Sequence, residues 1–122
     1  DTPDRGAYKF DNPNEPARVR PLTVRELKSW MDQGKSFELF DVRDDGERRL
    51  ASIAQARPLD ADGEKHLLGL AKDTPVVVLC HHGVRSRSAG ERVLREGFKS
   101  VYNLEGGIDA WSQEIDASVP RY

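Results

Sequence analysis

The chain has 122 residues, of which 37% are hydrophobic and 33% are charged, and its formal net charge is −2. This length fits one domain. Because positive and negative charges are nearly balanced, nucleic acid or an anionic membrane is not expected as a partner. No apolar run approaches the roughly 20 residues that cross a bilayer, and a single cysteine forms no internal disulfide, so we expect a cytoplasmic protein.

The chain is expected to begin with a segment that has no regular structure. Residues 1–16 carry three prolines and no hydrophobic periodicity, which predicts a flexible tail or linker. The domain itself is then expected to span residues 17–122. Its first element is a short edge strand at 18–20, which Pro21 should end.

The first helix has clear start and stop signals. Thr23 and Glu26 stand three residues apart in the capping-box pattern, and Gly34 follows the last apolar residue at helical spacing. Short apolar runs and helix-spaced apolar residues alternate after it. They predict a strand over 37–42, a helix over 44–50, a strand over 56–59, a helix over 64–72, a strand over 76–79, a helix over 87–97, a strand over 100–104 and a helix from 108 to about 115.

Strands that alternate with helices are typical of an α/β fold with parallel pairing and right-handed crossovers. The segment 76–79 is apolar at every position, which fits a strand that is covered on both faces of the sheet. We therefore expect a small doubly wound sheet, mainly parallel, with helices on both faces. Ligands of such sheets bind at the carboxyl ends of the strands, and Cys80 stands at one of these ends.

Cys80 is the only cysteine, and a buried strand, a glycine-containing loop and a helix start meet at its sulfur. A helix N-terminus offers unpaired N–H groups and a positive dipole end, which lower the pKa of a nearby thiol. Because the thiolate is the reactive form, Cys80 is a candidate nucleophile. The alternative is a buried structural cysteine, since free cysteine is often buried.

Three segments resemble the rhodanese (sulfurtransferase) domain family in order and spacing: 40–43 (FDVR), 80–86 (CHHGVRS) and 101–111 (VYNLEGGIDAW). The resemblance runs from about Pro21 to the end of the chain. It implies that a persulfide forms on Cys80, with thiosulfate or another sulfane-sulfur donor and a thiol, cyanide or a protein as acceptor. No cofactor is implied.

The closing residues, 108–113 (IDAWSQ) and 118–122 (SVPRY), also resemble those of rhodanese domains that follow a monothiol glutaredoxin in bacterial fusion proteins. A fused or partner glutaredoxin is therefore a further implied partner, although the chain contains no glutaredoxin motif.

The loop after Cys80 is suited to anions, because backbone N–H groups can hold a donor such as thiosulfate without a metal. Gly83 permits a tight turn, Arg85 can place a fixed charge near the anion, and Ser86 is placed to cap the following helix. For Arg85 the alternative is an ion pair with Glu47 or Asp41. The predicted substrate-binding residues are His81, His82, Gly83, Val84, Arg85 and Ser86.

Other residues are expected to support this loop. Asp41 and Arg43 end a neighbouring strand, and Asp41 is interpreted mainly as a hydrogen-bond acceptor that fixes loops. No metal site is expected, because Cys80 and the adjacent histidines cannot easily direct three donors to one ion. Trp111 is expected either to form a pocket wall with the Gly106–Gly107 turn or to pack in the core.

The sequence is compared with four possible functions. The first is a thiosulfate-type sulfurtransferase, and the second is a persulfide relay or carrier that serves a partner or fused redox domain. A phosphatase or arsenate reductase, which is similar in fold, uses five residues between cysteine and arginine, whereas four separate Cys80 from Arg85 here. The intact loop argues against the fourth, a non-catalytic regulatory domain.

Overall fold

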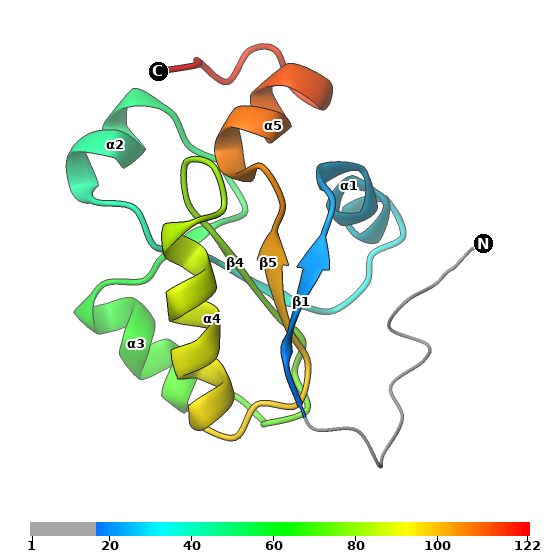
Figure 1. The fold of residues 1–122 in the computed structure, drawn as a ribbon, viewed down its shortest axis with the longest axis vertical. Helices are drawn as coiled ribbons and strands as arrows, with labels where there is room; N and C mark the ends of the chain where they lie inside the picture. The colour runs from blue at the N-terminus through cyan, green and yellow to red at the C-terminus, as the bar shows by residue number, and fades with distance from the viewer. Residues whose placement is uncertain (1–16) are drawn as a thin grey trace.

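The computed structural model describes residues 17–122, and the tail predicted for residues 1–16 lies outside the described residues. Strands and helices alternate along this part of the chain (Figure 1). Their bounds are β1 Val19–Leu22, α1 Val24–Asp32, β2 Glu38–Asp41, α2 Asp45–Leu50, β3 Arg57–Pro58, α3 Ala61–Leu68, β4 Val76–Leu79, α4 Arg85–Arg95, β5 Val101–Leu104 and α5 Gly107–Glu114. None of these helices has the length and apolar character that spanning a membrane requires.

The five strands form one sheet in the order β1-β5-β4-β2-β3, and every neighbouring pair is parallel. The register places Asp41 of β2 opposite Leu79 of β4, and Val78 of β4 opposite Asn103 of β5. The carboxyl ends of these three strands therefore finish at the same edge of the sheet. This confirms the predicted α/β architecture and brings the residue after β4, Cys80, to that edge.

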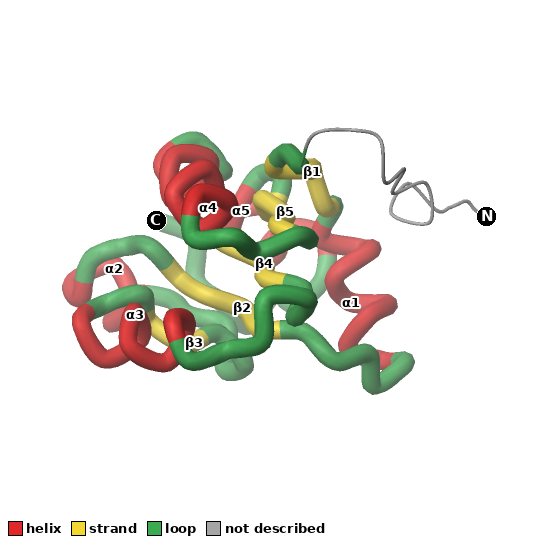
Figure 2. The backbone as a smooth tube through the Cα atoms, turned by 90° about the horizontal axis from the view of Figure 1, so that it is seen from below, coloured by secondary structure: helices red, strands yellow, loops and turns green. Residues whose placement is uncertain are grey.

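Helices cover both faces of the sheet, as predicted, with β4 between them (Figure 2). Side chains of a strand alternate between faces. On β4, Val77 and Leu79 pack with residues of α1 and α5, while Val76 and Val78 pack with residues of α3 and α4. Burial on two sides explains why β4 is apolar throughout.

Several element boundaries differ from the predicted ones, and those of β1, α3 and α4 are among them. Strand β1 continues through Pro21 to Leu22, because β1 lies at the edge of the sheet, where a strand tolerates a proline that cannot donate a ladder hydrogen bond. Helix α3 begins earlier than expected, because the Asp60 side chain accepts from Gly63 N and caps it. Helix α4 begins at Arg85, two residues before the expected start.

Candidate active site

The sulfur of Cys80 lies directly after β4 and accepts hydrogen bonds from the loop that follows. Gly83 N donates to Sγ at 3.1 Å, and the backbone N and side-chain Oγ of Ser86 each donate at 3.4 Å. Cys80 itself is 1% exposed. Three donors thus converge on one buried sulfur, and the loop and the first turn of α4 supply all of them.

This surrounding lowers the pKa of the Cys80 thiol below its usual value. Burial is the largest single influence and acts in the opposite direction, because it disfavours the charged thiolate. The hydrogen bonds from the Ser86 side chain and from the backbone of Ser86, Gly83 and His82 together outweigh burial. The site therefore stabilises the form of cysteine that reacts as a nucleophile.

Ser86 does not cap α4 as the sequence predicted. The N-cap is Val84, which has helical backbone angles and makes no side-chain cap hydrogen bond, so Ser86 lies inside the first turn. There its buried hydroxyl lies within hydrogen-bond distance of both the Cys80 sulfur and Asn103 Oδ1, so the two acceptors share its single proton. The residue predicted to organise the helix instead organises the sulfur.

Asn103 is a site residue that sequence reasoning missed. Its Oδ1 accepts from the Ser86 hydroxyl, and its Nδ2 donates to Gly83 O at 2.8 Å, so it ties the loop and the first turn of α4 to β5. The available signal was one amide side chain in the otherwise apolar strand 101–104. A polar group buried in such a strand needs partners, and here those partners belong to the loop.

The start of α5 packs against the loop from the other side. Ile108 N donates to Cys80 O at 2.9 Å, and Asp109 N donates to His81 O at 3.1 Å. Gly107 has a φ of +59°, and a Cβ there would lie 2.3 Å from Cys80 O, so only glycine permits this close approach. The loop is therefore held between α4, α5 and β5.

Asp41 and Arg43 form a buried pair beside the site rather than in it. Arg43 NH2 lies 2.6 Å from Asp41 Oδ2, and both side chains are almost fully buried. Arg43 also donates to Ala51 O at 2.7 Å and to the Tyr122 hydroxyl at 3.0 Å. The pair ties β2 to α2 and to the end of the chain, as the structural interpretation of Asp41 expects.

Arg85 forms an ion pair with Glu47, which was the alternative to direct anion contact. Its two terminal nitrogens donate to the two carboxylate oxygens at 2.7 and 2.8 Å. Glu47 belongs to a capping box at the start of α2, where its backbone N bonds the Asp44 side chain. Arg85 holds the pKa of Glu47 well below its usual range, and Glu47 raises the pKa of Arg85.

Tyr122 closes a small network around this ion pair. Its hydroxyl donates to Glu47 Oε2 at 2.8 Å, and its ring stacks on the His81 ring with centroids 3.9 Å apart and planes 7° apart. The network thus connects the active-site loop with α2 and the end of the described chain. No sequence pattern indicated these contacts, because 75 residues separate Tyr122 from Glu47.

The outer side of the loop is open to solvent. The side chain of His82 is 62% exposed and Val84 is 78% exposed. A cavity of about 340 Å³ lies beside them, lined by His82, Gly83, Val84, Arg87, Asn103, Glu105 and Gly106. Gly106 lines this cavity, as expected for the Gly106–Gly107 turn. Trp111 does not line it but is 5% exposed and packs in the core, which was the alternative expectation.

The family model of the rhodanese-like domain matches residues 23–114. The chain belongs to this family. Thiosulfate sulfurtransferase GlpE of Shewanella oneidensis is 36% identical to this rhodanese-like domain over 93 residues, which cover 75% of this chain and 91% of that protein. The rhodanese-like domain protein of Staphylococcus aureus superposes with a TM-score of 0.68 at 28% identity, covering 85% of this chain and 99% of that chain.

A longer relative carries a similar domain. The Mycobacterium tuberculosis protein named "Probable adenylyltransferase/sulfurtransferase MoeZ" is 34% identical over 115 residues, which cover 92% of this chain. The chain spans only 29% of the length of that relative. Both this relative and GlpE carry the word sulfurtransferase in their names.

Proposed function

We propose that the protein is a sulfurtransferase that carries sulfane sulfur on Cys80. The Cys80 thiolate attacks the outer sulfur of a donor such as thiosulfate, a new S–S bond forms, and the donor's S–S bond breaks with its electron pair leaving on sulfite. An acceptor, such as cyanide or a thiolate, then attacks the outer sulfur of the Cys80 persulfide. The Cys80 thiolate leaves with the bond electrons, which restores the starting enzyme.

The observation that carries this proposal is the convergence of three hydrogen-bond donors on a sulfur at the carboxyl end of β4. The same donors can stabilise the thiolate before attack and the anionic persulfide after it, since both carry negative charge on sulfur. Neither step needs a proton from a distant general acid, because sulfite and the Cys80 thiolate both leave as anions.

Steady-state thiocyanate formation from thiosulfate and cyanide tests this reaction. A ping-pong mechanism predicts parallel double-reciprocal lines when both substrates are varied. Cys80→Ser should abolish turnover, whereas Ser88→Ala, an exposed change on the same helix, should leave it unchanged. Intersecting lines, or activity that survives in Cys80→Ser, would exclude a Cys80 persulfide as the intermediate.

The second candidate is a relay that receives sulfur from a protein or thiol persulfide, including one on a fused or partner glutaredoxin. Two features favour it: Glu47 already engages the Arg85 guanidinium that would attract thiosulfate, and exposed Val84 offers an apolar contact for a partner. The domain-sized match within the longer MoeZ relative is in keeping with such a role.

The two candidates differ in donor preference. A relay should accept sulfur from glutathione persulfide with kcat/KM at least tenfold above that for thiosulfate, and Val84→Asp should impair delivery to a protein acceptor more than to cyanide. A thiosulfate enzyme shows the reverse donor order and no selective effect of Val84→Asp.

A further inference from the structure

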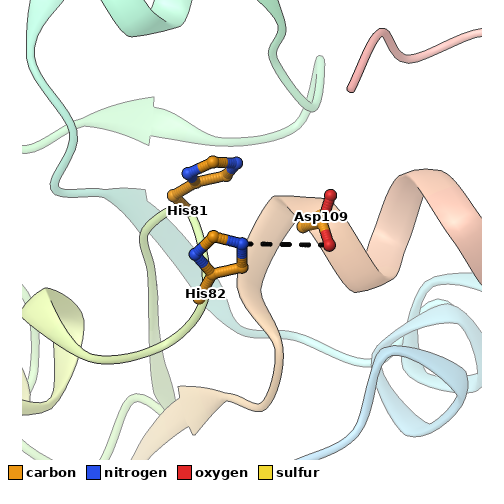
Figure 3. A group of neighbouring side chains, drawn as sticks. All are labelled: His81, His82 and Asp109. Carbon is orange, nitrogen blue, oxygen red and sulfur yellow. Dashed lines mark ion pairs between the residues drawn. The ribbon is translucent and has the colours of Figure 1, made fainter. Parts of the chain in front are cut away.

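Three side chains with metal-binding atoms meet at the outer side of the active-site loop (Figure 3). They are His81 and His82 of the loop and Asp109 in the first turn of α5. One ligand atom from each lies within 4.8 Å of the other two, and His82 Nε2 is 3.9 Å from Asp109 Oδ2. Tetrahedral zinc, with bonds of about 2.0–2.2 Å to nitrogen and oxygen, needs its donors roughly 3.4 Å apart. Side-chain rotations that shorten the distances between the three donors would bring them to one ion.

The backbone fixes the relative positions of the loop and α5. Asp109 N donates to His81 O, and Ile108 N donates to Cys80 O, so the first turn of α5 cannot drift from the loop that carries both histidines. The two imidazole rings lie against each other, with centroids 3.9 Å apart, and because imidazole lone pairs lie in the ring plane, the rings must turn before both nitrogens face one ion. The backbone hydrogen bonds thus fix the loop and α5 relative to each other before any ion binds, which lowers the entropic cost of forming a three-ligand site.

An unpartnered nitrogen gives independent support. Nε2 of His81 is buried and has no hydrogen-bond partner, the only such side-chain nitrogen or oxygen found among residues 17–122. Buried polar atoms in native proteins nearly always have a partner, so an orphaned imidazole nitrogen in this place needs an explanation. Coordination of an ion by this ring would supply one.

We propose that His81, His82 and Asp109 form a binding site for a zinc ion. Two imidazoles and one carboxylate suit a borderline metal such as zinc, whereas magnesium and calcium prefer oxygen ligands throughout. The set differs from the cluster weighed in the sequence, because Asp109 replaces Cys80 as the third donor. Three protein ligands leave a fourth position open to water or to a further ligand.

Zinc must compete with the present partners of Asp109. Arg121 Nε lies 2.9 Å from Asp109 Oδ1, and Gln113 Nε2 donates to Oδ2 at 2.8 Å. Arg121 is half-exposed and can swing into solvent, so the ion pair lowers zinc affinity without blocking the site. This competition makes a specific prediction, namely that removing Arg121 strengthens zinc binding.

Zinc titration against a chromophoric chelator tests the site, with the full chain carrying Cys80→Ser so that the thiolate cannot bind the ion. We expect one zinc per chain. His82→Asn and Asp109→Asn should each weaken binding at least tenfold, and Arg121→Gln should tighten it several-fold. His66→Asn is the matched control, because His66 pairs with Glu38 away from the loop and should not change the affinity.

Other results would overturn the proposal. Zinc binding that needs Cys80 would indicate a thiolate site, and equal affinities in the parent, His82→Asn and Asp109→Asn would indicate adventitious binding. Circular dichroism of each variant establishes that it is folded. His82 is largely exposed, so its substitution tests the site even if the Asp109 variant is unstable.

Discussion

Ser86→Ala tests how the loop activates the thiol. The substitution removes one of the three donors to the Cys80 sulfur and leaves the two backbone N–H groups in place. A hydrogen bond to a charged group contributes about 1.5–3 kcal/mol, and the 3.4 Å distance of Oγ from Sγ places this one near the lower end. About 1.4 kcal/mol corresponds to a factor of ten in the thiolate-to-thiol ratio. At pH values below the thiol pKa, Ser86→Ala should therefore contain about tenfold less thiolate than the parent.

The assay is the rate of iodoacetamide alkylation as a function of pH, because only the thiolate reacts. In Ser86→Ala the midpoint of this profile should move to higher pH, while Ser88→Ala should reproduce the parent profile. Removal of the hydroxyl also leaves Asn103 Oδ1 without its donor, so a stability loss of about 1–3 kcal/mol is expected as well. An unchanged alkylation profile in a folded Ser86→Ala protein would refute this account of the thiol.

Glu47→Gln should release Arg85 and lower the apparent KM for thiosulfate, whereas Arg85→Ala should reduce kcat/KM by a factor equivalent to about 1–3 kcal/mol. A lower Tm with intact kinetics in Arg85→Ala would instead show that this half-exposed arginine serves only as the ion-pair partner of Glu47. Because the pKa of the Cys80 thiol is lowered on folding, the folded state binds fewer protons, and the free energy of unfolding should rise as the pH approaches the ordinary thiol pKa of about 8.5. Urea titrations at pH values from about 6 to about 9 should show this rise in the parent and not in Cys80→Ser. The loop, with four residues between Cys80 and Arg85, should hydrolyse no aryl phosphate, and Cys80-dependent release of phosphate would overturn the sulfurtransferase assignment.

The sequence was most informative where local patterns decide structure. The apolar run before Cys80 predicted a buried strand, and the Thr23 capping box forms as expected, with both of its hydrogen bonds present. These signals depend on neighbouring residues only, so they survive whatever the rest of the chain does. The α/β class follows from them because alternating strands and helices permit few arrangements.

Contacts between segments that are distant in the chain could not be predicted from local sequence patterns. The role of Asn103 depends on the order of strands, which places β5 beside β4, and the Tyr122 network depends on where the end of the chain returns. Ser86 was misplaced for a related reason. A serine near a helix start is a common cap, but α4 begins with Val84 as its N-cap and turns the serine toward the sulfur instead.

Intact-mass spectrometry after incubation with thiosulfate tests most directly whether Cys80 carries the sulfur. A persulfide adds one sulfur atom, so the mass should rise by about 32 Da, and cyanide should return it to the starting value. Peptide mapping should place the added sulfur on Cys80, and Cys80→Ser should gain none. A parent protein that turns over thiosulfate while its mass never rises by one sulfur would contradict the proposed mechanism.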